Sequence, residues 1–287
     1  MNKKWFIILG IMFLFILSYI PFKNISWGPQ IGVIKINDAI MESESVVKNL
    51  NDFHIREDID AIILRINSPG GGVAASQEIY EKVKQISEQN KKPIIASMAT
   101  VAASGGYYIA CGADTIIANR GTTTGSIGVI MSYPIAARLM QKIGLQFQSV
   151  KSGELKDAGN FSRVPTKEEL DYFQNLVDDL HQQFVDVVAY ERGMLYEGAS
   201  KLATGEVFSG QQAFDNDLVD IIGTFDDSIE LISKLIGINE KPKLVYPKEK
   251  KQGVWDILSN NSKIDFPFSN MNIFPLPEYS LYYGGNN

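Results

Sequence analysis

Cysteine and histidine are the scarcest chemically reactive residues in this sequence. Its 287 residues include one cysteine, Cys111, and two histidines, His54 and His181. One cysteine excludes an intramolecular disulfide, and so few cysteines and histidines give little support for a metal site. We therefore expect no metal ion and no cofactor. Cys111 lies in a run rich in glycine and alanine, where we expect it to be packed in the core.

Long basic runs are also missing. The formal net charge is −6 and the sequence pI is about 5.1. Nucleic-acid-binding proteins usually carry clustered positive charge, so we expect no nucleic-acid partner. Hydrophobic residues make up 45% of the chain, which is enough to bury a substantial core.

One long apolar run without charge is present, at residues 5–22, and Lys3 and Lys4 precede it. At about 1.5 Å per residue it nearly spans a hydrocarbon core about 30 Å thick. A cleaved signal peptide would need small residues at its end, and residues 19–23 supply none, so an uncleaved anchor is favoured. The lysines predict a cytoplasmic N-terminus and an extracytoplasmic remainder. We thus expect residues 1–27 to form a cytoplasmic N-terminus and a single transmembrane helix in the cell membrane.

Strands and helices are predicted to alternate along residues 28–240. Apolar runs predict strands at 30–36, 59–66, 93–98, 115–118, 127–131 and 145–150. Helical spacing predicts helices at 46–50, 73–89, 104–111, 134–143, 167–192 and 227–235. This alternation is typical of an α/β domain with largely parallel strands. The character of the sequence changes past about residue 240, and residues 260–287 are rich in asparagine, proline, serine and aromatics, so 241–287 are predicted to be a linker and an extended or partly disordered tail.

Three consecutive glycines, Gly70, Gly71 and Gly72, follow the predicted strand at 59–66. Glycine lets the backbone approach a ligand closely, and its N–H groups could point at an anion. The spacing matches neither a dinucleotide fingerprint nor a P-loop. A tight strand-to-helix turn explains the motif equally well.

Ser104 stands among alanines and glycines, directly after a predicted strand and at a predicted helix start. Small neighbours would let a substrate backbone reach the hydroxyl, and the helix start would favour developing negative charge. An ordinary N-cap serine is the alternative. Ser126, in a stretch with several threonines and two glycines, is a competing nucleophile, although turn hydrogen bonds also explain that stretch.

A serine nucleophile needs a base. His181 lies within the predicted helix at 167–192, and His54 lies in a polar segment, so neither has a catalytic setting. Lys156, in a loop between Gly153 and Gly159, is the other candidate, because a desolvated lysine amine can act as a general base. Most lysines are simply solvated, and for Lys156 alone that alternative stays open.

Taken in order, these pieces resemble the signal peptide peptidase A family of serine–lysine membrane proteases. The matching segments are SPGGG, ASGGYY, TGSIGVI, SGELKD and VFSGQQAFDNDLVD, and the resemblance covers about residues 30–240. It implies a Clp-protease/crotonase-like ββα superhelix with largely parallel strands, an N-terminal transmembrane helix and a serine protease domain over 28–240. Two positions depart from the family pattern: Asp217 replaces a usual glycine, and Leu155 replaces a frequent aromatic residue.

The resemblance also implies roles for individual residues. The nucleophile falls on Ser104, the general base on Lys156, the oxyanion hole on the backbone N–H groups of Gly71 and Gly105, and a lysine-orienting hydroxyl on Ser126. The peptide is expected to lie along strand edges, where its contacts would be Gly70, Gly72, Gly128, Val129, Met131 and Ser132.

The implied function is a membrane-anchored serine endopeptidase that degrades signal peptides left in the membrane after secretion. Family members form ring-like or dome-like homo-oligomers, and in some the serine and lysine come from adjacent subunits. The alternatives are a protease of other membrane-associated proteins, a crotonase-like acyl-CoA enzyme and an inactive membrane scaffold. The tail at 260–287 is rich in aromatic residues, so it could enter the substrate groove or be trimmed there; a plain interfacial or disordered tail is the other hypothesis.

Overall fold

The computed structural model describes residues 28–238, 240–248 and 278–282. The predicted anchor at 1–27 and most of the predicted tail lie outside these residues. Within the described ranges, no helix is long and apolar enough to cross a membrane.

The main sheet confirms an α/β fold with largely parallel strands. Its order is β10-β1-β2-β4-β5-β9, and all of these neighbours are parallel. Its strands are β1 (Gln30–Asn37), β2 (Ala61–Ser68), β4 (Ile94–Ala103), β5 (Thr115–Ala118), β9 (Ile221–Ile222) and β10 (Lys243–Val245). β6 (Thr123–Gly125) pairs in parallel with β4 and antiparallel with β8 (Val207–Ser209).

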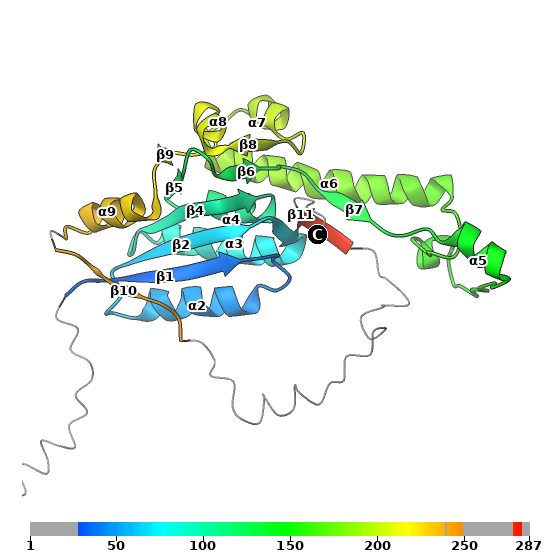
Figure 1. The fold of residues 1–287 in the computed structure, drawn as a ribbon, viewed down its shortest axis with the longest axis horizontal. Helices are drawn as coiled ribbons and strands as arrows, with labels where there is room; N and C mark the ends of the chain where they lie inside the picture. Colours follow the sequence, from blue (N-terminus) through cyan, green and yellow to red (C-terminus); the bar gives the residue numbers. More distant parts are fainter. Residues whose placement is uncertain (1–27, 239, 249–277, 283–287) are drawn as a thin grey trace, which may run out of the picture.

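Helices cover both faces of this sheet (Figure 1). Side chains alternate along a strand, so Ile62 and Leu64 join the larger core, while Ile63 joins a smaller core with Ile232 of α9 (Phe225–Leu235). Burial on both faces explains why the strands are apolar almost without interruption. The larger core is closed by α2 (Glu44–Ile55), α3 (Val73–Glu88), α4 (Gly105–Cys111) and α6 (Lys167–Glu191).

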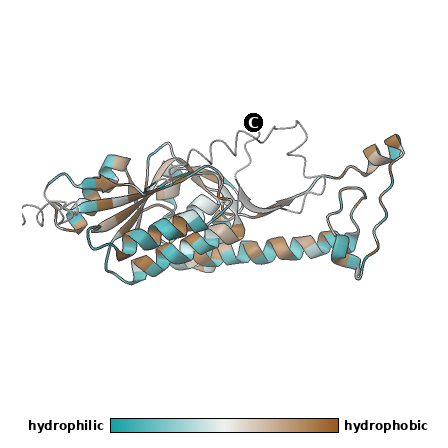
Figure 2. Cartoon of the chain, turned by 90° about the horizontal axis from the view of Figure 1, so that it is seen from below, coloured by the Kyte–Doolittle hydropathy of each residue, from teal (hydrophilic) through white to brown (hydrophobic). Residues whose placement is uncertain are grey.

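The long helix α6 belongs half to this body and half to a projecting arm (Figures 1 and 2). Its C-terminal half buries Phe184, Val185 and Val188 in the core, whereas its N-terminal half buries only Glu169 and Phe173. The far end of the arm carries α5 (Ala137–Ile143), and the 3-10 helix η1 (Glu154–Asp157) follows before α6 begins. The short helices α7 (Tyr196–Leu202) and α8 (Gly210–Asp215) lie at the opposite end of α6.

A second, small sheet lies between the body and the arm. It has the order β3-β11-β7, with β11 (Glu278–Tyr282) antiparallel to both β3 (Gly70–Gly72) and β7 (Ile130–Ser132). Two strands, β10 and β11, therefore lie within the segment 241–287 that the sequence predicts to be a linker and tail.

Two predicted strands differ from the structure. The strand predicted at 145–150 is wrong, because these residues are all exposed and form no strand. The strand predicted at 127–131 is found as β7 at Ile130–Ser132. Alternating apolar residues form a strand only where another strand offers hydrogen bonds. In the part of the chain that the structure describes, no strand lies beside residues 145–150.

Candidate active site

Ser104 occupies a strained turn between the end of β4 and the start of α4. Its φ of 53° and ψ of −119° are unusual for a residue other than glycine. The backbone is held by two hydrogen bonds: Ser104 N–H donates to Gly125 O at 2.7 Å, and Ser104 O accepts from Tyr108 N–H at 2.9 Å. The residue is 1% exposed, and its Oγ has no hydrogen-bond partner among the described residues. A buried, unpaired hydroxyl on a strained backbone is typical of a functional position.

The small residues after Ser104 are required by packing. A β-carbon added to Gly106 would lie 3.0 Å from Ser68 O. Tyr107 then fills the core, fully buried, and its hydroxyl donates to Leu218 O at 2.9 Å. The helix therefore starts tightly against the end of β2, and this fixes the direction of the Ser104 turn.

The two predicted oxyanion residues, Gly71 and Gly105, lie side by side. A β-carbon added to Gly105 would overlap Ser76 Oγ and lie 3.3 Å from both Gly70 Cα and Gly71 N. A β-carbon on Gly71 would overlap the backbone of Ile40. Both positions therefore exclude side chains, and two backbone segments meet directly beside Ser104.

Backbone pairing sets the direction of the Gly71 N–H. Gly72 N–H donates to Ile40 O at 2.7 Å, and Ile40 N–H donates to Gly70 O at 2.8 Å. Successive residues of a strand present their N–H and C=O groups to opposite sides. The N–H and C=O of Gly71 therefore face away from Ile40, toward the side where β11 lies.

Lys156 lies on η1, in the segment between α5 and α6. It is exposed and lines a shallow hollow with Glu168, in the first turn of α6. The structure does not bring it to Ser104, whose Oγ has no partner among the described residues. The body contacts α6 elsewhere: the rings of Tyr108 and Phe184 lie 4.9 Å apart. Residues 168 and 184 are about 24 Å apart along the helix axis.

A cluster of charges fastens the Lys156 segment to α6. Asp157 accepts from Lys151 Nζ at 2.9 Å and from Arg163 Nη2 at 3.0 Å. Arg163 also pairs with Glu169, whose side chain is 2% exposed. Hydrogen bonds from Arg163 and Lys151 lower the pKa of Asp157 to about 2. The sequence analysis missed this cluster, although the opposite charges lie close together in the printed sequence.

Ser126 directly follows Gly125, whose carbonyl accepts the hydrogen bond from Ser104 N–H. It has a φ of 51°, and its N–H donates to Glu206 O at 2.7 Å. It is 8% exposed and lines a hollow with Val177 and His181, in the middle of α6. The structure thus places Ser126 near Ser104 and not beside Lys156, which lies on η1 and lines a different hollow.

The predicted peptide-contacting residues fall on the small sheet and next to it. Gly70 and Gly72 lie on β3, and Met131 and Ser132 lie on β7. Gly128 and Val129 precede β7, and a β-carbon on Gly128 would lie 3.3 Å from Gly205 Cα. Strand β11 lies between β3 and β7.

The histidines and the cysteine each have contacts away from Ser104, and His54 Nδ1 is buried without a partner among the described residues. His54 Nε2 is 3.0 Å from Gln89 Oε1, and His181 Nε2 is 2.9 Å from Ala203 O. Cys111 is buried, as predicted, and burial raises the pKa of its thiol to about 12. None of the three is a partner of Ser104 Oγ.

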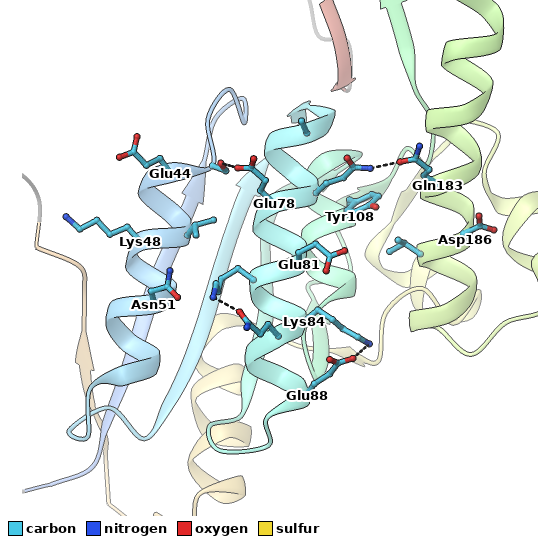
Figure 3. A pocket seen from close by; sticks show the side chains of 17 residues that line it. Glu44, Lys48, Asn51, Glu78, Glu81, Lys84, Glu88, Tyr108, Gln183 and Asp186 are labelled. Atoms are coloured by element: carbon cyan, nitrogen blue, oxygen red, sulfur yellow. Dashed lines mark hydrogen bonds and ion pairs between the residues drawn. The ribbon is translucent and has the colours of Figure 1, made fainter.

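A wide hollow that Ser104 does not line lies over α2, α3 and α6 (Figure 3). Charged and amide side chains line most of it, and several are paired with each other: Lys84 Nζ lies 3.7 Å from Glu88 Oε1, and Gln77 bonds Gln183 at 2.9 Å. In the residues that the structure describes, no group of three histidine, cysteine or acidic side chains could hold a metal ion. Among the described residues, the hollow therefore holds no metal site.

Comparisons with known proteins place the chain among peptidases. The profile of peptidase family S49 matches residues 86–239, and that of Clp protease matches residues 31–131. A Synechocystis sp. protein, to which the name protease is given by inference, is 38% identical over 256 residues. The match covers 88% of this chain and 91% of that protein. An Enterococcus faecium protein is named signal peptide peptidase SppA, a name given to it by inference. It is 34% identical to this chain, and the match covers 80% of this chain and 71% of the Enterococcus faecium protein. Protease 4 of Haemophilus influenzae is 34% identical over 72% of this chain but only 35% of its own length.

Proposed function

The chain belongs to peptidase family S49 and is a serine peptidase, and on this premise we propose that it is a membrane-anchored endopeptidase with a Ser104–Lys156 dyad. The observation that carries the proposal is the setting of Ser104. Its buried hydroxyl has no partner among the described residues, its backbone is strained, and it adjoins the paired glycines Gly71 and Gly105.

The proposed reaction uses these groups in sequence. Neutral Lys156 removes the proton from Ser104 Oγ as the oxygen attacks the scissile carbonyl. The N–H groups of Gly71 and Gly105 stabilise the oxyanion, and each such donor is worth roughly 2.7–4 kcal/mol in a comparable site. Lys156 then protonates the leaving amine, and water hydrolyses the acyl-enzyme. Ser126 helps to orient the lysine once it reaches the site.

We propose that Lys156 is supplied by a second copy of the chain. Within one chain Lys156 lies on the arm, and Ser104 Oγ has no partner among the described residues. The arm also exposes apolar side chains that a monomer would normally bury. The most exposed are Val150, Val164, Ile143, Leu139 and Ile135. A homo-oligomer of ring or dome form would cover these side chains and complete each site.

The proposed substrate and cellular location of the enzyme are based on the predicted anchor and on the names of its relatives. The apolar run at 5–22, preceded by lysines, supports a single span of the cell membrane with a cytoplasmic N-terminus and an extracytoplasmic catalytic domain. The Enterococcus faecium relative is named for signal peptide peptidase activity. We propose that extended peptides, notably signal peptides left in the membrane, bind between β3 and β7.

The test is labelling with a fluorophosphonate together with peptide hydrolysis by the full chain in detergent. We expect Ser104 to be labelled, and Ser104→Ala and Lys156→Ala each to abolish hydrolysis while the protein still elutes as an oligomer. Labelling of Ser126 instead would mean that the nucleophile is assigned wrongly. Binding of acyl-CoA without any hydrolysis would support the crotonase-like alternative.

A further inference from the structure

Two buried serines hold the three-glycine strand β3 at its two ends. Ser68, the last residue of β2, and Ser76, in the first turn of α3, are both fully buried. The Ser68 hydroxyl donates to Asp38 O at 2.5 Å and accepts from Gly70 N–H at 3.1 Å. The Ser76 hydroxyl donates to Gly72 O at 3.0 Å. One hydroxyl therefore binds the first glycine of β3, and the other binds the last.

The backbone groups of Gly70 and Gly72 that the serines leave free are bonded to Ile40. Gly70 O accepts from Ile40 N–H at 2.8 Å, and Gly72 N–H donates to Ile40 O at 2.7 Å. The Gly71 N–H shares a planar peptide unit with the Gly70 C=O, so it points the opposite way, away from Ile40. The direction of this proposed oxyanion donor is therefore set by bonds made at the neighbouring glycines.

Ser76 also touches the residue that carries the second proposed donor. A β-carbon on Gly105 would overlap Ser76 Oγ and lie 3.3 Å from the Gly71 nitrogen. The hydroxyl thus packs against the start of α4 while it bonds the end of β3. Because protein interiors are close-packed, an atom in this place sets the distance between the two backbone segments.

We propose that Ser68 and Ser76 are positioning residues for the oxyanion hole, an inference that rests on the proposed function. Neither hydroxyl takes part in the proton transfers, and each acts through the backbone of β3. Without the Ser68 hydroxyl, the Gly70 N–H loses its bond, and the turn that leads into β3 is less firmly held. Without the Ser76 hydroxyl, a space opens beside Gly105 and one bond to Gly72 O is lost.

Either loss shifts the Gly71 N–H relative to the Gly105 N–H. Oxyanion donors are effective only when they lie about 2.7–3.1 Å from the oxygen of the tetrahedral intermediate. The carbonyl of a bound substrate makes weaker use of these donors, so the transition state loses more stabilisation than the bound substrate does. The rate of reaction should therefore fall while substrate binding is kept.

Ser233 supplies a matched control, because it makes the same kind of bond away from the site. Its hydroxyl donates to Ile229 O, four residues earlier on α9, at 2.6 Å, just as Ser76 bonds Gly72 O. Ser233 is also buried, and α9 packs against the smaller core, on the other face of the main sheet from α3. A bond of this kind with a purely structural role affects stability alone.

Steady-state peptide hydrolysis by the full chain in detergent, together with inhibition by a peptide aldehyde, tests the proposal. The aldehyde forms a reversible hemiacetal with Ser104, and the oxygen of this adduct occupies the oxyanion position. We expect Ser68→Ala and Ser76→Ala each to lower kcat about tenfold to hundredfold, with KM changed by less than about twofold. The affinity for the aldehyde should fall by the same factor as kcat. Ser233→Ala should keep kcat, KM and aldehyde affinity, and thermal unfolding of all three variants reports their stability.

Wild-type kcat and aldehyde affinity in folded Ser68→Ala and Ser76→Ala would overturn this proposal and leave the proposed function standing. A rise in KM alone, or an equal loss of kcat in Ser233→Ala, would also overturn it, because the effect would then follow binding or stability. If one serine variant fails to fold, the other decides, since the two serines bond different glycines. A wild-type chain that neither hydrolyses peptides nor reacts with the fluorophosphonate would overturn both this proposal and the proposed function.

Discussion

Gly105 lies in contact with Gly71, so that a β-carbon on Gly105 would come within 3.3 Å of the Gly71 nitrogen. These two glycines are 34 positions apart in the chain, on α4 and β3. Their contact brings two backbone segments to one point beside Ser104. An oxyanion hole requires two such N–H groups near a nucleophile, so a substitution that separates them should affect the reaction more than the fold.

Gly105→Ala is expected to lower kcat by about 10²–10³, the usual effect of losing one oxyanion donor. The added methyl group would overlap Ser76 Oγ, which is held by its own hydrogen bond to Gly72 O at 3.0 Å. To remove this overlap, either the Ser76 side chain or the Gly70–Gly71 backbone must move. Peptide hydrolysis at saturating substrate measures the effect.

Gly121→Ala is the matched control for this change. A β-carbon at Gly121 has nothing within 4 Å, so kcat should be unchanged. Equal activity of Gly105→Ala and the wild type would show that the contact between Gly105 and Gly71 does not position an oxyanion donor. Thermal unfolding of both variants separates this loss from general instability.

The sequence predicts the body of the fold well because its signals there are local and redundant. The long helix predicted at 167–192 is found at Lys167–Glu191, with a capping box in which Thr166 and Glu169 bond each other's backbone N–H groups. The predicted strand at 59–66 is found as β2 at Ala61–Ser68. A run of apolar residues and a cap suffice for such elements.

The short strands and the placement of Lys156 depend on distant partners, and this is why the sequence did not predict them. β10 and β11 exist only because β1, β3 and β7 offer hydrogen bonds. The segments around Gly71 and Ser104 meet because parallel strands end at the same edge of the sheet. No such rule determines where the loop with Lys156 lies, since the Asp157–Arg163–Glu169 contacts and the length of α6 decide it.

The attachment of the arm loop is expected to depend on the charge of Asp157. Its pKa is lowered to about 2 by Arg163 and Lys151, below its usual value of about 3.9. The carboxylate therefore stabilises the folded loop above about pH 4, and this contribution of about 1 kcal/mol is lost as the pH falls toward 2. Hydrogen exchange across residues 151–163, measured between pH 5 and pH 2, should report this loss.

Asp157→Asn should produce the same faster exchange at neutral pH, and it should lower activity because Lys156 is less well placed. Glu154→Gln is the matched control, since the Glu154 side chain is 84% exposed and its ion pair is with Lys151, at 3.4 Å. Exchange in Asp157→Asn that is as slow as in the control would mean that the ion pairs do not hold the loop.

Cys111 is expected to be unreactive in the folded protein. It is buried, and its pKa is raised to about 12, so it is present as the thiol and not as the nucleophilic thiolate. Iodoacetamide should leave the native enzyme fully active and unlabelled, and should label Cys111 after denaturation. Inactivation of the native enzyme that follows labelling would contradict the structural role of this residue.

Mixing two inactive variants tests whether the dyad is shared between subunits. Ser104→Ala lacks the nucleophile and keeps Lys156 on its arm; Lys156→Ala keeps the nucleophile and lacks the base. If each site takes its lysine from a neighbour, random co-assembly at equal amounts leaves about one quarter of the sites with both groups. We therefore expect the unfolded, mixed and refolded variants to recover about a quarter of wild-type hydrolysis, while each variant treated alone stays inactive. A dyad within one chain allows no such recovery, because every chain in the mixture lacks one of the two groups. Persistent inactivity in a mixture that forms oligomers would thus place Lys156 and Ser104 in the same chain, and would require the arm to fold back toward the body.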